Sequence, residues 1–400
     1  MPAVGSADRS PWAVFLIFLR LGLTSFGGPI AHIGYFHSEF VTRRAWLNER
    51  AYADLVALCQ FLPGPASSQV GMALGLSRAG YAGAFAAWAG FTLPSAVAMI
   101  LFAQSVAGFG GILLNNGVLH GLKVVAVAVV AQAIWGMARS LCPDVQRVTV
   151  MTAAACLTLL MSSALMQVGV ILAAGIAGAT MFKPGQAVDR DPLPVMVSRR
   201  AGMVWLALFF ALLVVLPVLA YLFPSRPMAV ADAFYRTGSL VFGGGHVVLP
   251  LLQAEVVLPG WVGDEVFLAG YGAAQAVPGP LFTFAAFLGA SLSDGFSGWL
   301  GGIFCLAMIF LPSFLLVAGT LPFWERLCHY GRMQAVLSGV NAAVVGLLVA
   351  AFFHPVWTGA IRRPQDFAMA MVAFVALMFW KLPPWAVVVG CGTAGWLLGG

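Results

Sequence analysis

Thirteen apolar runs, each long enough to span or nearly span a lipid bilayer, constrain this chain more than any other feature. No run alternates apolar and polar residues as a membrane strand does, so each predicts a helix. Only 8% of the 400 residues are charged, whereas a soluble domain carries about 25%. This excludes a cytosolic enzyme, a nucleic-acid-binding protein and a disordered chain, and predicts an all-α polytopic membrane protein. The runs lie at about 12–28, 52–76, 80–104, 117–138, 148–163, 165–182, 203–222, 230–247, 266–291, 296–320, 334–354, 366–380 and 384–399.

The charges and cysteines narrow this class further. A net charge of +6 and a pI near 9.2 are typical of a multi-pass inner or plasma membrane protein with basic cytoplasmic loops. The six cysteines form no CxxC pair and no cluster with histidine, so we expect apolar packing rather than a metal site. No Walker, HExxH, GxSxG or haem motif occurs, which predicts no cofactor and no enzymatic activity. The first run ends in SFGGP, so we expect no cleaved signal peptide.

The two sides of the polar stretch 183–202 repeat each other. FLRLGLTSFGG at 18–28 matches FYRTGSLVFGG 216 residues later, and QFLPGP at 60–65 matches QAVPGP 215 residues later. LPS at 93–95 and VLHG at 118–121 have counterparts 218 residues on. Such matches, in one order and at nearly constant offset, indicate a duplicated unit of six apolar segments. We therefore predict a first repeat at 1–182, a cytoplasmic linker plus an extra central span at 183–229, and a second repeat at 230–400.

The orientation of the two repeats follows from counting crossings. If every run crosses once, an odd number of crossings separates equivalent points, and the repeats are inverted. If the Pro-Gly-Pro break makes 52–76 a re-entrant hairpin, the repeats are parallel, and loop charges do not decide between the counts. We favour inversion. Each repeat has an even number of spans, so one extra central span between them places the second repeat in the opposite orientation to the first.

Two motifs occur once in each repeat, FGG and Q-x-x-PGP. Proline and glycine free backbone groups within a membrane segment, and such broken helices are tolerated where they line a cavity. A half-helix that begins after the break points its positive end into the cavity, which suits an anion. Hydroxyl groups just after the breaks could cap the half-helices or bind the anion. The candidate residues here are Gly27, Gly28, Gln60, Pro63, Gly64, Pro65, Ser67, Gly243, Gly244, Gln275, Pro278, Gly279, Pro280 and Thr283.

Three cations fall inside predicted spans: Arg20, its equivalent Arg236, and Lys123. All acidic residues lie in loops or near segment ends, so these cations have few acidic partners of matching depth. A cation within a bilayer is costly and usually faces a partner or a pathway. The three are therefore predicted to bind an anionic substrate; snorkelling to an interface is the alternative.

Histidines and carboxylates near the motifs are candidates for coupling or gating. His32 and His246 follow the two FGG motifs at non-equivalent positions, and either could carry a proton or donate to an oxyanion. Glu39 and Glu255 are equivalent in the duplication, which distinguishes them from ordinary loop acids. We assign His246 to the substrate site, and His32, Glu39, Asp54 and Glu255 to coupling or gating.

At FGGP-x-AHIGYF (26–36), at Q-x-x-PGP followed by Gln69 and Gly71, and at their second-half counterparts, the chain resembles the chromate ion transporter family. The likeness covers nearly the whole chain, since long members of that family consist of two homologous halves joined by a linker. It implies export of chromate from the bacterial cytoplasm, with sulfate as a structural analogue, and halves of opposite orientation. The second half carries GGGH where the first carries GGPI, so the halves are not interchangeable.

Together these features predict a secondary transporter that exports chromate by alternating access, with the oxyanion and the lipid bilayer as partners. A transporter of sulfate or another oxyanion is the alternative. An anion channel and a membrane-embedded enzyme acting on lipid phosphate fit less well. The sequence leaves open the driving force, a homo-oligomer, and whether 52–76 and 266–291 cross or re-enter.

Overall fold

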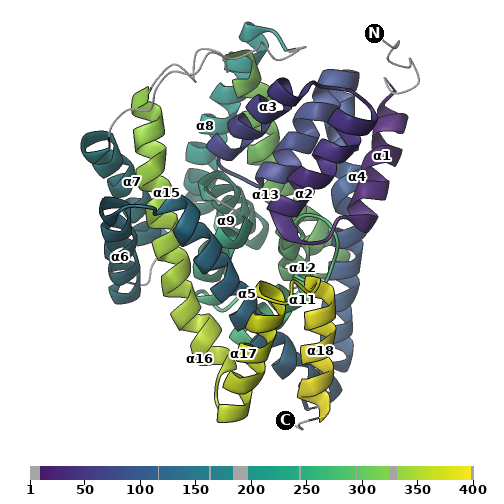
Figure 1. Ribbon diagram of the computed structural model, residues 1–400, viewed down its shortest axis with the longest axis vertical. Helices are drawn as coiled ribbons and strands as arrows, with labels where there is room; N and C mark the ends of the chain where they lie inside the picture. Colours follow the sequence, from purple (N-terminus) through teal and green to yellow (C-terminus); the bar gives the residue numbers. More distant parts are fainter. Residues whose placement is uncertain are drawn as a thin grey trace.

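A computed structural model describes residues 10–115, 117–161, 164–182, 197–242, 245–293, 295–323 and 331–397. Within these ranges every regular element is a helix and no strand occurs. The first described helix, at Pro11–Thr24, lies in the upper part of Figure 1, and the last, at Pro384–Leu397, lies in its lower part. The prediction of an all-α protein with many apolar helices is confirmed.

The first half of the chain forms short helices followed by long ones. Ser10 and Asn48 cap the first and third helices by accepting hydrogen bonds from backbone N–H groups, as N-cap residues do. The elements are α1 (Pro11–Thr24), α2 (Gly28–His37), the π-helix η2 (Ser38–Arg43), α3 (Glu49–Phe61), α4 (Ala66–Asn115), α5 (Val118–Leu141), α6 (Val145–Leu160) and α7 (Ala164–Met181).

The second half repeats this order after one additional helix, α8 (Arg199–Leu222). Its short helices are α9 (Arg226–Leu240), η3 (Gly245–Val247), α10 (Val248–Leu252), η4 (Gln253–Val257), α11 (Asp264–Ala274), η5 (Leu281–Thr283) and α12 (Phe284–Ala290). The remaining elements are α13 (Gly298–Thr320), η6 (Leu321–Phe323), α15 (Gly331–Ala351), η7 (Phe352–Trp357), α16 (Thr358–Ala360), α17 (Pro364–Met378) and α18 (Pro384–Leu397).

The long element α4 is a tight helical hairpin. Gly80 turns the chain with a φ of +62°, a conformation that glycine adopts without cost. Its first arm (66–79) then packs on its second arm (81–115) so closely that a Cβ on Gly75 would collide with the backbone of Gly83. Gly289 of α12 and Gly301 of α13 make the same contact in the second half. The duplication is therefore visible in the packing as well as in the sequence.

Two of the apolar runs, 12–28 and 52–76, do not form single long helices. Helix α1 has 14 residues, about 21 Å at 1.5 Å per residue, which is shorter than a hydrocarbon core of about 30 Å. The run 52–76 consists of α3, a non-helical link at 62–65 and the first arm of α4. Among the described residues, the helices long and apolar enough to cross a membrane are Ala66–Gly108 with its turn at Gly80, Val118–Leu141, Arg199–Leu222, Gly298–Phe323 and Gln334–Ala360.

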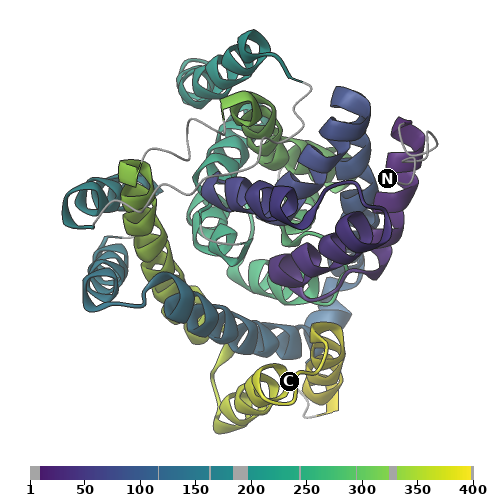
Figure 2. The same ribbon diagram turned by 45° about the horizontal axis from the view of Figure 1, so that its top comes forward.

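The two halves exchange their last helices. Helices α6 and α7 pack on α15 of the second half, whereas α17 and α18 pack on α5 of the first half. Glycines allow the close approach: Gly121 of α5 meets the backbone of α18, and its equivalent Gly339 meets Gly178 of α7. In Figures 1 and 2 these helices form an outer row along one side of the central group. Neither half could bury these surfaces alone.

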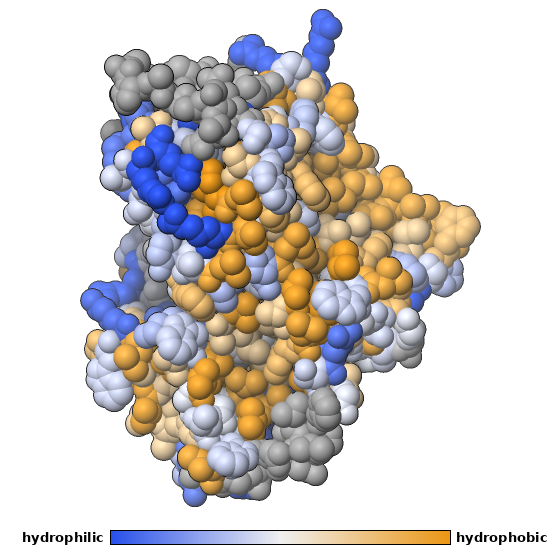
Figure 3. Space-filling view, turned by 90° about the vertical axis from the view of Figure 1, so that its right-hand side faces the viewer, coloured by the Kyte–Doolittle hydropathy of each residue, from blue (hydrophilic) through white to orange (hydrophobic). Residues whose placement is uncertain are grey.

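The outer surface is largely apolar. Figure 3 shows apolar side chains over the middle of the face that includes α1 and α4, with hydrophilic side chains gathered toward its upper part and left margin. In α8, only 6% of the most apolar 18-residue window is buried within the protein. Such a helix needs an apolar solvent, so the chain is an integral membrane protein.

Candidate functional site

Two reciprocal hydrogen bonds join the halves at the centre of the fold. The Gly64 N–H donates to the Val241 carbonyl at 2.6 Å, and the Gly279 N–H donates to the Ser25 carbonyl at 3.0 Å. Gly64 and Gly279 are equivalent, and so are Ser25 and Val241. Each PGP segment is thus bonded to the chain just before the FGG motif of the other half. We call these four residues and the helix ends beside them the central junction.

Local sequence explains why the chain turns here. Gly64 and Gly279 have φ values of +118° and +100°, which side chains with a Cβ rarely adopt. A Cβ on Gly64 would collide with Ser313, and one on Gly279 would collide with Ser95, the equivalent serine of the other half. The flanking prolines, Pro63 with Pro65 and Pro278 with Pro280, have no N–H to donate, so the glycine supplies the cross-half bond.

Polar side chains of the first half surround this junction. His32 is 1% exposed and contacts the Ser67 Oγ through Nδ1 and the Ser25 carbonyl through Nε2, both at 3.3 Å. Because a carbonyl oxygen only accepts, Nε2 carries the hydrogen and Nδ1 accepts the Ser67 hydroxyl. The Gln69 Nε2 donates to the Pro63 carbonyl at 2.6 Å and lies 3.5 Å from the Ser313 Oγ. His32 and Gln69 thereby hold both helix breaks in place.

The other predicted site residues are more dispersed. Gly27 and Gly28 lie where α2 begins, with positive φ, whereas Gly243 and Gly244 fall outside the described residues. Gln60 is exposed and Gln275 is half-buried at the end of α11. Thr283 donates back to the Pro280 carbonyl at 2.9 Å.

Two further predicted residues, His246 and Asp54, belong to the surroundings of the junction. The His246 Nδ1 lies 2.8 Å from the hydroxyl of Tyr271 on α11. Asp54 is buried within α3. Helices α3 and α11 are equivalent, and each ends a few residues before a PGP segment. Both residues are therefore associated with the helices that lead into the breaks.

The prediction that the deep cations have few acidic partners is wrong. Arg20 lies 3.6 Å from Glu39, Arg236 lies 2.8 Å from Glu255, and Lys123 lies 3.2 Å from Glu265. The short helices fold back on themselves, and this brings loop carboxylates to the level of the cations. Duplication has preserved an arginine–glutamate pair, Arg20 with Glu39 and Arg236 with Glu255.

The two equivalent pairs differ in charge balance. Glu39 is 7% exposed and also binds Arg43 at 3.1 Å and Arg44 at 2.7 Å, so one carboxylate faces three cations. Arg236 binds Asp232 at 3.2 Å in addition to Glu255, so one cation faces two carboxylates. The first cluster is rich in positive charge and the second is rich in negative charge.

Lys123 serves a different contact. Its side chain is 6% exposed, and Glu265 joins it to Arg362 at 3.3 Å. The Lys123 ammonium, with help from Arg362, holds the pKa of Glu265 below its usual range. Since α5 and α11 belong to different halves, this ion pair links them.

Replacing the two partners separately should distinguish a structural Lys123 from a substrate ligand. Lys123→Met removes a buried charge and keeps the packing, so we expect less than about 1 kcal/mol of destabilisation and unchanged transport. Glu265→Ala leaves the buried ammonium unpaired and should cost about 1–3 kcal/mol. Thermal unfolding in detergent, with the remaining folded protein quantified by size-exclusion chromatography, measures the stability of both variants. Loss of transport in a stable Lys123→Met protein would instead identify Lys123 as a substrate ligand.

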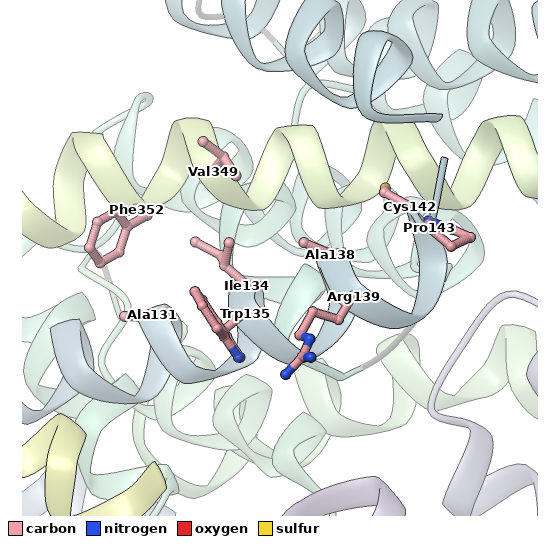
Figure 4. A pocket seen from close by; sticks show the side chains of 9 residues that line it. All are labelled: Ala131, Ile134, Trp135, Ala138, Arg139, Cys142, Pro143, Val349 and Phe352. Carbon is pink, nitrogen blue, oxygen red and sulfur yellow. The ribbon is translucent and has the colours of Figure 1, made fainter. Parts of the chain in front are cut away.

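A separate groove of about 670 Å³ lies between α5 and α15, away from the central junction. Figure 4 shows Ile134 of α5 on the side of Val349 and Phe352, with Trp135 and Arg139 next to it along the groove. The Arg139 guanidinium stacks over the Trp135 ring at 5.8 Å. None of the predicted site residues lines this groove.

The sequence analysis missed several polar residues at the junction. They are Ser25, Thr92, Ser95 and Ser313, which are each at most 1% exposed although all lie in apolar runs. The repeated LPS motif pointed to Ser95 and Ser313, but only the folded chain places them against the PGP glycines.

Broken helices from two homologous repeats, meeting at a buried polar junction, define a class of polytopic membrane transport proteins. The chain belongs to the chromate transporter family, whose profile matches residues 12–179 and again 228–396. A chromate transport protein of Cupriavidus metallidurans is 26% identical over 98% of this chain and 95% of its own length. One of Pseudomonas aeruginosa is 28% identical over 96% of this chain and 92% of its own length.

A shorter relative supports the duplication. The uncharacterized transporter YwrB of Bacillus subtilis is 30% identical over 42% of this chain, which covers 83% of its own length. A single repeat thus occurs as a protein of its own. No solved structure matches this chain at a significant level.

Proposed function

We propose that this chain is a secondary transporter that exports chromate from the bacterial cytoplasm across the inner membrane by alternating access. The observation that carries the proposal is the central junction, where two half-buried to buried PGP breaks are bonded reciprocally across the halves. Helix N-termini next to such breaks offer N–H groups and a positive dipole end to an anion. Family membership and the names of the full-length relatives support chromate as that anion.

The two repeats, 1–182 and 230–400, are inverted in this proposal. Three antiparallel pairs of helices each bring the chain back to the membrane side from which it started. They are α1 with α2, α3 with the first arm of α4, and α6 with α7. This holds whether the two helices of a pair cross the membrane or only re-enter it. The second arm of α4, α5 and α8 then remain as crossings, and their number is odd. In agreement, α1, α2 and α3 lie in the upper part of Figure 1, whereas α11 and α12 lie below them.

Sidedness follows from the basic residues. By this count the beginning of α1 and the beginning of α8 lie on one side, and we assign that side to the cytoplasm by the positive-inside rule. The short helices of the first repeat then enter from the cytoplasm and those of the second from the opposite side. Their breaks meet between the two surfaces, which gives one site two alternating routes of access.

The substrate site in this proposal lies at the breaks, and the ion pairs act as gates. The first-turn N–H groups of the helices that follow the PGP breaks face the anion in this proposal. Because Arg20 and Arg236 are paired with Glu39 and Glu255, we assign each pair to gating, by rearrangement when the repeats move. A dianion that leaves a negatively charged cytoplasm gains about 4–5 kcal/mol at 100 mV, so the membrane potential favours export.

Sulfate or another tetrahedral oxyanion is the alternative substrate, because it has the same shape and charge as chromate. Purified protein in proteoliposomes should transport chromate when a potential is imposed. Unlabelled sulfate and molybdate added as competitors rank the substrates, and imposed pH gradients test proton coupling. Protein-free vesicles are the control. No chromate flux under any gradient, together with sulfate flux, would replace chromate by sulfate.

A further inference from the structure

The duplication allows the two sides of the central junction to be compared residue by residue. Counted from the shared motifs, Ser25 corresponds to Val241 and His32 to Val248. Ser67, Gln69 and Thr92 correspond to Phe282, Phe284 and Phe310. All ten side chains are at most 2% exposed. These five buried positions are therefore polar in the first half and apolar in the second, whereas Ser68 corresponds to another hydroxyl residue, Thr283.

Several of these polar atoms have no protein partner. Among the residues that the structure describes, the hydroxyls of Ser25, Ser68 and Thr92 and the Oε1 of Gln69 form no hydrogen bond. A buried polar group without a partner costs about 1–3 kcal/mol, so four such groups near one junction predict that a ligand or water molecules supply the missing hydrogen bonds.

These residues lie at or near the N-terminus of one helix, α4. Ser68 and Gln69 lie in the first turn of α4, whose first arm has fourteen residues before Gly80. The carbonyl of Ser25 accepts from both His32 and Gly279. Thr92 follows Phe91, whose carbonyl faces Gly279 and whose ring contacts His32 at 5.1 Å between centroids. The first-turn N–H groups of α4 thus share a neighbourhood with three free hydroxyls.

We propose that the transporter has a single, asymmetric oxyanion site, built by the first repeat at the start of α4 and lined by the hydroxyls of Ser25, Ser68 and Thr92. This rests on the proposed function, and it locates the anion in one half rather than on the symmetry axis. The second repeat supplies the opposing wall, through Gly279 and the aromatic side chains of Phe282 and Phe284. Hydroxyl and N–H donors suit a tetrahedral oxyanion, since each oxygen accepts hydrogen bonds.

His32 and Gln69 are positioning residues in this site. Both nitrogens of His32 are engaged by Ser25 and Ser67, and the Gln69 amide nitrogen holds the PGP segment. The Gln69 Oε1 is an acceptor, which a dianion would not bind, so a water molecule that donates to it fits better.

Paired hydroxyl deletions in the two halves test the proposal. Ser68→Ala, Ser25→Ala and Thr92→Val should each raise the KM for chromate, and for sulfate as a second probe, by about tenfold or more, because each removes a hydrogen bond to a charged ligand. The matched control is Thr283→Val, at the position equivalent to Ser68, and we expect less than about a threefold change. Equilibrium binding of radiolabelled sulfate should give one anion per chain.

The possible results separate this inference from the proposed function. If the wild-type protein neither binds nor transports chromate or sulfate, the proposed function fails. If the wild type transports but Thr283→Val raises KM as much as Ser68→Ala, or two anions bind per chain, the asymmetric site is wrong. The unfolding temperatures of all four variants in detergent are measured as well. A variant with a lowered unfolding temperature has a folding defect, and its change in KM is not attributed to the site.

Discussion

The Arg236→Ala variant is expected to lose about 2–4 kcal/mol of unfolding free energy. The substitution leaves Asp232 and Glu255 without their shared cation, and both side chains are largely buried, at 13% and 14% exposed. Breaking a fully buried ion pair from one side costs about 3–5 kcal/mol, and partial exposure reduces this. The midpoint of thermal unfolding in detergent, compared with the wild type, measures the loss.

The duplication supplies the matched control, Arg20→Ala. Arg20 is 58% exposed, lies 3.6 Å from Glu39, and leaves that carboxylate with two other arginines when removed. An exposed pair of this kind contributes about 0–1 kcal/mol. The triple variant Arg236→Leu, Glu255→Gln and Asp232→Asn should recover stability, because no uncompensated charge remains. Equal losses for Arg20→Ala and Arg236→Ala would contradict the charge asymmetry of the two clusters.

The Gly279→Ala variant is expected to lose stability and transport together. Its φ of +100° costs a residue with a Cβ about 1–3 kcal/mol. The added methyl group also meets Ser95, and overpacking adds about 1–3 kcal/mol. We expect a total of about 2–6 kcal/mol, with a similar effect for Gly64→Ala, measured as the yield of monodisperse protein and its unfolding midpoint.

A glycine in a helix with free space beside it is the control. A methyl group added at Gly136 of α5 would meet no neighbouring atom within 4 Å, so Gly136→Ala should be neutral or stabilising by up to about 1 kcal/mol. Adding Ser95→Gly to Gly279→Ala removes the clash but not the backbone strain, and should recover part of the loss. A Gly279→Ala protein with wild-type stability and flux would show that the left-handed turn at the junction is not required.

Much of the architecture could be predicted from the sequence. Rare residues that recur in the same order and at nearly constant offset revealed the duplication. The offset stays nearly constant because packed helices seldom accept insertions or deletions. The PGP and FGG motifs marked the places where helices end, since proline and glycine break helical hydrogen bonding wherever they occur. Both features depend on local backbone chemistry, which the sequence states directly.

The partners of the cations could not be predicted in the same way. The apolar run at 12–28 predicted that Arg20 lies within one spanning helix. In the structure α1 ends at Thr24, and α2 runs back alongside α1. That return brings Glu39 to Arg20, and its equivalent brings Glu255 to Arg236. Apolar run length does not distinguish one crossing helix from two short antiparallel ones, because both bury the same apolar residues.

The asymmetry of the junction likewise has one part that the sequence states and one part that only the fold reveals. The replacement of Ser25, Ser67 and Thr92 by Val241, Phe282 and Phe310 is written in the sequence. Its meaning depends on the cross-half bonds of Gly64 and Gly279, which place these equivalent positions around one junction.

The sequence by itself determined that this chain is a duplicated, helical membrane protein of the chromate transporter family, with breaks at fixed places. It could do so because hydropathy, proline and glycine act locally. Only the tertiary structure decided that the deep cations are paired, that the halves exchange their last helices, and that the free hydroxyls belong to one half of the junction. These properties depend on tertiary contacts, which join residues as far apart in the sequence as Gly279 and Ser25, and the packing of the whole chain brings such residues together.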